Sequence, residues 1–170
     1  MGVNGLWDVV KNAAQLRSLL NLATLDGFQR NNRKQRALAY RTFCNSAIAI
    51  LAATRRHTAR LQLAQWSRAP VILIFVFDGF GRPLVKRGKQ VLAQPESLIQ
   101  ACKEAIKAFG YYSHQAPGEA EAELAQMNKL GFIDAVITED SDTLVFGAVC
   151  IIRKLGPNIK TNAEILEGLR

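Results

Sequence analysis

The clearest sign of the fold is one continuous apolar run, VILIFVF at residues 71–77, followed directly by Asp78-Gly79. A run of this length and composition is typical of a strand buried on both faces of a parallel sheet. Residues 132–138 and 149–152 have the same character, and residues 111–114 suggest a shorter strand. We therefore expect several buried strands lying side by side.

Two stretches between these runs have the apolar spacing of helices. One extends from Pro95 to Gly110, and the other from Pro117 to Gly131. Proline at the start and glycine at the end are typical helix boundaries. Strands that alternate with helices predict a three-layer α/β fold, with a mostly parallel central sheet flanked by helices.

The N-terminal half predicts a different set of elements. Residues 6–20 have helical apolar spacing, and Trp7 is expected to pack in the core. Residues 37–66 are rich in Ala, Leu and Ile and contain no Gly or Pro, which predicts a long helix. Residues 81–89 are expected to form a basic loop.

The composition describes a globular chain with an uneven charge. The 170 residues are 49% apolar, which excludes wholesale disorder, and the formal net charge is +8. No Asp or Glu occurs from Gly27 to Phe77, whereas nine Lys and Arg do, so the whole positive excess lies in this segment. It fits either a polyanion partner or a solvated basic face.

The same composition bears on the compartment. No apolar run approaches the roughly 20 residues of a membrane span, and the first residues do not resemble a secretory signal. Three widely spaced cysteines argue against a disulfide framework. We expect an intracellular protein that does not act at a membrane.

Five carboxylates are placed where a site is expected. Asp78, Asp140 and Asp142 follow predicted strands, and Glu119 and Glu121 open a predicted helix. Ligands of open α/β sheets bind at the carboxyl ends of the strands, so these side chains should converge. Carboxylate oxygens suit Mg²⁺, and two such ions can hydrolyse a phosphodiester. Alternatively, the glutamates only complement a helix dipole and the aspartates only cap a turn.

Four ordered blocks resemble a known family. They are MGVNGLW at residues 1–7, FVFDG at 75–79, QAPGEAEAELA at 115–125 and TEDSDTLVFGA at 138–148. Together they resemble the XPG/flap endonuclease family of structure-specific 5′ nucleases, in particular its GEN-like group. The resemblance implies a PIN-like fold over a single domain, residues 1–170, with an XPG N-terminal-like region at 1–90 and an I-region-like part at 91–170.

The resemblance also implies a function and its residues. The activity would be hydrolysis of flapped or branched DNA by two Mg²⁺ ions, for which Mn²⁺ could substitute, in the nucleus. Asp78, Glu119, Glu121, Asp140 and Asp142 match the metal-shell carboxylates. Lys86, or less closely Arg87, matches a basic residue that approaches the scissile phosphate, and Gly2 matches a glycine near the DNA backbone. The basic segments add contacts to DNA phosphates by Arg30, Arg33, Lys34, Arg36, Lys86, Arg87 and Lys89.

The sequence departs from the family in three places. The family has an earlier strand that ends in a metal-binding Asp; that strand looks missing here, and Tyr40 or Arg41 stands where the Asp belongs. The arch usually found between the positions of Asp78 and Glu119 must be rudimentary. The family's last metal-shell Asp and its helix-two-turn-helix segment would follow Arg170. The resemblance is thus to a divergent, C-terminally truncated member.

These departures leave three interpretations. The first is a Mg²⁺-dependent DNA endonuclease weakened by the loss of one carboxylate. The second is a catalytically inactive nucleic-acid-binding module on the same fold. The third is that residues 28–70 derive from an erroneous gene model. Protein partners cannot be inferred from the sequence.

Overall fold

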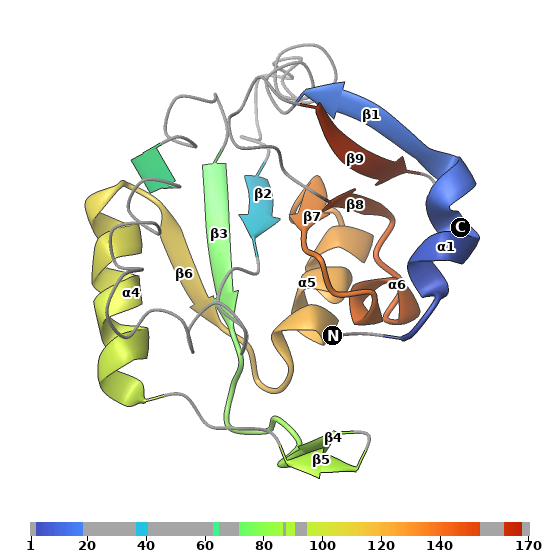
Figure 1. The fold of residues 1–170 in the computed structure, drawn as a ribbon. Coiled ribbons are helices and arrows are strands. Elements are labelled where there is room, and N and C mark those ends of the chain that lie inside the picture. The colour runs from blue at the N-terminus through green and yellow to red at the C-terminus, as the bar shows by residue number, and fades with distance from the viewer. Residues whose placement is uncertain are drawn as a thin grey trace.

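The computed structural model describes residues 3–18, 37–40, 63–64, 72–86, 88–90, 95–153 and 162–167. Their main feature is a seven-stranded sheet with strand order β1-β9-β8-β7-β2-β3-β6 (Figure 1). The strands are β1 (Ala14–Ser18), β2 (Ala37–Tyr40), β3 (Ile72–Phe77), β6 (Tyr112–Gln115), β7 (Ala135–Ile137), β8 (Cys150–Arg153) and β9 (Asn162–Glu167). Neighbouring strands from β8 to β6 pair in parallel, whereas β9 is antiparallel to both β8 and β1.

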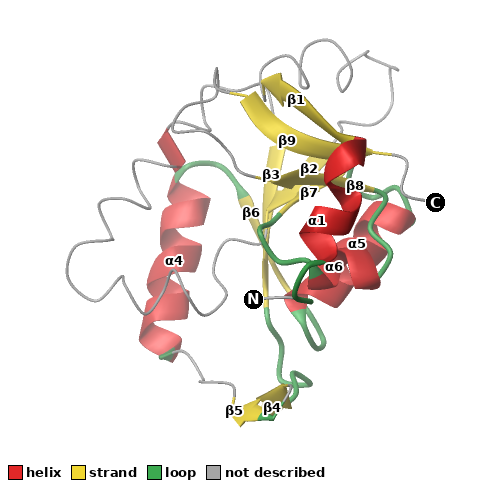
Figure 2. Ribbon diagram, turned by 45° about the vertical axis from the view of Figure 1, so that its right-hand side comes forward, coloured by secondary structure: helices red, strands yellow, loops and turns green. Residues whose placement is uncertain are grey.

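Helices cover the two faces of this sheet. Helix α4 (Glu96–Ala108) lies on one face, and α1 (Leu6–Val10), α5 (Ala120–Lys129) and α6 (Asp142–Val145) lie on the other (Figure 2). The predicted three-layer α/β architecture is therefore confirmed. Among the described residues, no helix is both long enough and apolar enough to cross a membrane.

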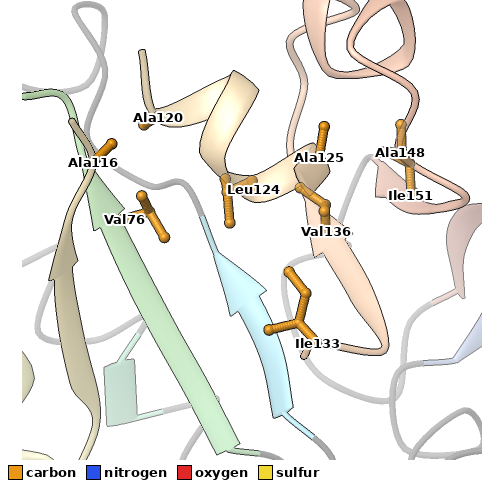
Figure 3. Close-up of a cluster of buried hydrophobic side chains, with 9 residues drawn as sticks. All are labelled: Val76, Ala116, Ala120, Leu124, Ala125, Ile133, Val136, Ala148 and Ile151. Atoms are coloured by element: carbon orange, nitrogen blue, oxygen red, sulfur yellow. The ribbon is translucent and has the colours of Figure 1, made fainter. Parts of the chain in front are cut away.

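The alternation of side chains along the central strands produces two cores. In β3, Phe75 and Phe77 pack with residues of α4, while Val76 between them packs against α5. Figure 3 shows the second core, in which Leu124 of α5 lies over the sheet with Val136 of β7. Strands with apolar side chains on both faces are what the continuous runs predicted.

Two predicted elements are wrong in the N-terminal half. Residues 6–20 do not form one helix, because α1 ends at Val10, a short 3₁₀ helix follows at Lys11–Ala13, and β1 begins at Ala14. The segment predicted to be a helix over 37–66 opens with strand β2. Strand β2 pairs with β3 on one side and with β7 on the other, and this pairing outweighs the helical propensity of the alanines and leucine in β2.

The expectation that an early strand is missing is also wrong. The early strand of the family is not missing, because β2 occupies the centre of the parallel sheet and ends at Tyr40. Residues 63–64 are helical, and the rest of 41–71 lies outside the described residues. The basic loop predicted at 81–89 contains a two-stranded hairpin, β4 (Val85–Lys86) with β5 (Lys89–Gln90).

Candidate active site at the carboxyl edge of the sheet

The predicted acids reach the same edge because their strands are parallel. Asp78 follows β3, Glu119 lies beyond the end of β6, and Asp140 and Asp142 follow β7. Strands β3 and β6 pair in parallel, and β2 joins β3 to β7 in the same direction. This is the convergence expected at the carboxyl ends of an open α/β sheet.

Lys86 joins two of these carboxylates. Its Nζ lies 3.0 Å from Oε1 of Glu119 and 2.8 Å from Oδ2 of Asp142. The Asp142 side chain is almost completely buried, with 6% of its surface exposed. Partial burial alone would lower the pKa of Lys86, but the hydrogen bonds and charges of Asp142 and Glu119 outweigh it and raise the pKa. The ammonium group therefore stays charged between the two acids at neutral pH.

Asp78 is held by different partners. Its Oδ1 accepts a hydrogen bond of 2.8 Å from the backbone N–H of Ala120, and its Oδ2 lies 3.1 Å from Nη1 of Arg82. Ala120 is the first residue of α5, so the carboxylate of Asp78 caps that helix from another element. This contact ties the end of β3 to the helix that begins beside Glu119.

Asp140 orders the loop that carries Asp142. The Asp140 N–H donates to Oγ1 of Thr138 at 3.0 Å, and the Asp142 N–H donates to Oδ1 of Asp140 at 3.1 Å. Short-range bonds of this kind are typical of Asp in turns and at helix starts. Glu121 lies on α5 with only 2% of its surface exposed.

The N-terminal segment is docked on the same loop. Oγ of Ser141 donates to the carbonyl oxygen of Val3 at 3.2 Å, and Nε1 of Trp7 donates to that of Glu139 at 3.2 Å. The Arg153 guanidinium lies 3.8 Å from the centre of the Trp7 ring. Trp7 also packs against the second core, as predicted.

The carboxylate groups of Glu119 and Asp142 suit one hydrated divalent cation better than a site with two ions. Glu119 and Asp142 supply carboxylate oxygens around a position that already holds a positive group, and Mg²⁺ commonly takes one or two carboxylates plus water. Within the described ranges, however, no group of three or more His, Cys, Asp or Glu side chains could hold a metal ion. Asp78, Glu119, Asp140 and Asp142 lie at one edge of the sheet and Glu121 is buried on α5, but the described residues do not bring the five acids together as one ligand cluster.

The remaining predicted site residues divide into two groups. Gly2, Arg30, Arg33, Lys34, Arg36 and Arg87 lie outside the described residues, and Lys89 is described only as part of β5. Sequence reasoning missed Arg82 as a partner of Asp78. Its spacing of four residues from Asp78 was visible, but in a loop this spacing does not by itself predict an ion pair.

Known proteins resemble both the sequence and the fold. Residues 110–167 match the family described as XPG I-region. Flap endonuclease GEN-like 1 of Arabidopsis thaliana is 41% identical over 89 residues, which cover 51% of this chain and 15% of that protein.

Two solved structures match the fold over nearly the whole chain. One is the Holliday junction-resolving enzyme GEN1 in complex with product DNA, Mg²⁺ and Mn²⁺ ions, with a TM-score of 0.72 and 28% identity. That match covers 98% of this chain and 40% of GEN1. The other is the catalytic core of Rad2 in complex with DNA substrate, with a TM-score of 0.74 and 26% identity, covering 98% of this chain and 54% of that one.

The fold is thus that of the PIN-like 5′ nucleases. The family match, the relatives and the solved structures together support an XPG/flap endonuclease family member, and the chain spans only part of the length of these relatives.

Proposed function

We propose that this protein binds branched or flapped DNA and hydrolyses its phosphodiester bonds slowly, using a divalent cation held by Glu119 and Asp142. The observation that carries the proposal is the bridge made by Lys86, because it marks a position where two buried or half-buried carboxylates require a positive charge. The DNA in the GEN1 and Rad2 structures and the Mg²⁺ and Mn²⁺ of GEN1 support the substrate and the ion. Action on DNA would place the protein in the nucleus.

The residues have distinct roles in this proposal. A bound Mg²⁺ would polarise the phosphate and lower the pKa of a water molecule. Glu119 and Asp142 would hold the cation, and Lys86, released from them, would offer its charge to the phosphate. Asp78 and Asp140 orient these ligands through Ala120 and the Asp142 backbone. Asp78, Glu121 and Asp140 remain, by resemblance only, predicted members of the metal shell.

We expect slow turnover because no acid stands at the end of β2. The family's metal-binding Asp is expected there, and Tyr40 and Arg41 stand in its place. Loss of one anionic ligand would lower the affinity for a cation at this edge.

Cleavage of labelled DNA tests this function. Flap and four-way junction substrates are incubated with Mg²⁺ or Mn²⁺ and either the wild-type protein or Asp142→Asn. We expect slow cleavage by the wild type that requires the metal and is lost in the variant. Cleavage that survives in Asp142→Asn or in EDTA would contradict the proposed site.

The same observation supports a second candidate, a nucleic-acid-binding module that does not cut. In this case Lys86 permanently supplies the positive charge that Glu119 and Asp142 need, and no metal is taken up. DNA binding without any binding of Mg²⁺ or Mn²⁺ in a calorimetric titration would favour this candidate over the first.

A further inference from the structure

Phe80 is a fully exposed phenylalanine beside the carboxylate site. It follows Asp78 by two residues, and the ring is left in water although burying it would be favourable by roughly 1.5–3 kcal/mol. We propose that Phe80 is a stacking platform for an unpaired nucleobase next to the phosphate handled at this site. The inference rests on the proposed function and specifies its substrate: DNA with unpaired nucleotides at the point of binding.

The backbone presents Phe80 on a closed turn. The Arg82 N–H donates to the carbonyl oxygen of Gly79 at 3.2 Å, so Phe80 occupies the second position of a four-residue turn. Both sides of the turn are bonded to the loop before α5. The Gly79 N–H donates to Gly118 O at 2.7 Å, and the Gly81 N–H donates to Pro117 O at 2.9 Å. The ring is therefore held outward by a fixed backbone.

The two glycines permit this close contact. A Cβ on Gly79 would lie 1.7 Å from the carbonyl oxygen of Ala116, and one on Gly81 would lie 2.7 Å from that of Pro117. Neither position has room for a side chain, so the turn cannot be replaced by a looser one without losing its bonds. Leu84 and Val85 are exposed as well, so Phe80 belongs to a group of exposed apolar side chains, and such a group indicates a partner outside the protein.

The surroundings of Phe80 favour a nucleobase as that partner. The turn ends at Arg82, which forms an ion pair with Asp78 just before it, and it is bonded to the two residues that precede Glu119. Lys86 follows on β4 with its ammonium group at Glu119 and Asp142. Proteins hold single-stranded nucleic acid with exposed aromatic rings on surfaces that also carry basic residues, and Arg82 and Lys86 follow Phe80 in the same loop and hairpin.

A competing partner is an apolar protein segment. Leu84 and Val85, on the approach to and within β4, are also exposed and extend the apolar surface near Phe80. The two partners differ in one measurable respect. Only a stacked base makes the contribution of Phe80 depend on whether the DNA carries a base.

A double-mutant cycle with DNA tests this dependence. The full chain binds a flap DNA in EDTA, followed by fluorescence anisotropy, and the unpaired arm carries either thymines or abasic sugars. We expect Phe80→Ala to weaken binding of the thymine arm about 5- to 150-fold, the range of base–aromatic stacking, and to leave the abasic arm within about 2-fold. Phe80→Trp should preserve binding, whereas Phe80→Leu should behave like Phe80→Ala.

Phe132→Ala is the matched control. Phe132 is also an exposed phenylalanine, but it lies beyond the C-terminal end of α5, whose N-terminal end begins beside Glu119. Phe132→Ala should leave the affinity for both the thymine arm and the abasic arm unchanged. Because Phe80 is fully exposed, Phe80→Ala should keep the thermal midpoint of the wild type. Equal effects of Phe80→Ala on both arms, or none, overturn the inference alone. Failure of the wild-type chain to bind either DNA overturns the proposed function as well.

Discussion

Lys86 has two roles that a single substitution separates. In the structure it neutralises Glu119 and Asp142, and in the proposed reaction it must leave them for the phosphate. We predict that Lys86→Met raises the affinity for Mn²⁺, on the order of tenfold, because a competing cation is removed. The same variant should cleave more slowly at saturating metal.

The control for this prediction is Lys107→Met, which removes the same charge from the exposed last turn of α4. It should alter neither quantity. Calorimetry measures the affinity and gel electrophoresis the cleavage rate. A Lys86→Met protein that loses affinity for Mn²⁺ would show that the lysine supports the cation site rather than competing for it.

Tyr111 packs against the core that contains Phe75 and Phe77, and its hydroxyl group gives a test of that packing. Its hydroxyl oxygen is buried and has no hydrogen-bond partner among the described residues, while its ring centre lies 5.9 Å from that of Phe75. Tyr111→Phe keeps the ring and removes the unsatisfied hydroxyl, so we predict a gain of about 1 kcal/mol in the free energy of unfolding. Urea denaturation at pH 7 measures it, and a clear loss would contradict this.

The same substitution has a predicted pH dependence. Burial raises the pKa of Tyr111 to about 12, above its ordinary value of 10.0. The unfolded chain therefore releases this proton at a lower pH than the folded chain, and folding stability is lost as the pH rises above 10. The stability difference between Tyr111→Phe and wild type should widen between pH 10 and 12. A constant difference would show that the hydroxyl ionises equally in both states.

At the scale of elements, the joint between the end of β3 and the start of α5 positions the site. It depends on the absence of a side chain at Gly79, where a Cβ would lie 1.7 Å from Ala116 O. We predict that Gly79→Ala lowers the free energy of unfolding by about 3 kcal/mol, because the joint must open. Gly118→Ala is the control, since its Cβ would meet nothing closer than 3.6 Å. Similar effects of the two substitutions in urea denaturation would contradict this account.

The elements of the second half could be predicted from sequence because each carries a local signal. The apolar runs became β3, β7 and β8, and the spaced apolar residues became α4 and α5, within a few residues of the expected ends. Their patterns depend only on which faces are buried, and both faces of the sheet are covered.

The N-terminal half could not be predicted in this way because its strands depend on distant partners. Strand β1 pairs with β9, nearly 150 residues further along, in the register Ala14↔Leu166 to Ser18↔Asn162. Strand β2 is only four residues long and lies between β7 and β3. Neither pairing leaves a signature in the local pattern, and both segments have compositions that also suit a helix.

At the scale of the whole molecule, the topology placed the acids on one edge, as the sequence predicted. Their partners could not be predicted, because they depend on the hairpin that brings Lys86 to Glu119 and Asp142 and on the turn that brings Arg82 to Asp78. The positions of the candidate acids could therefore be predicted from the ends of strands and the start of a helix, whereas their ion pairs could not.

The net charge of +8 leads to a prediction about binding by the whole chain. Phosphates bound by lysine and arginine release counterions, so the affinity for DNA should fall steeply with salt. Replacing one lysine that is predicted to contact a phosphate, as in Lys89→Gln, should reduce the slope of log K against log salt by about 1. Lys107→Gln should leave the slope unchanged. An affinity that does not vary from 50 to 200 mM salt, roughly the range over which phosphate contacts are lost, would exclude phosphate contacts as the basis of binding.

The central claim is that Glu119 and Asp142 form a divalent-cation site. Titration of Mn²⁺, followed by the loss of the free-ion electron paramagnetic resonance signal, tests it most directly. Glu119→Gln and Asp142→Asn are compared with Glu104→Gln, which removes the same charge at an exposed position of α4. We predict saturable binding by the wild type and by Glu104→Gln, weakened at least about tenfold in the other two variants. No uptake by the wild type, or equal affinity in all four proteins, would contradict the account.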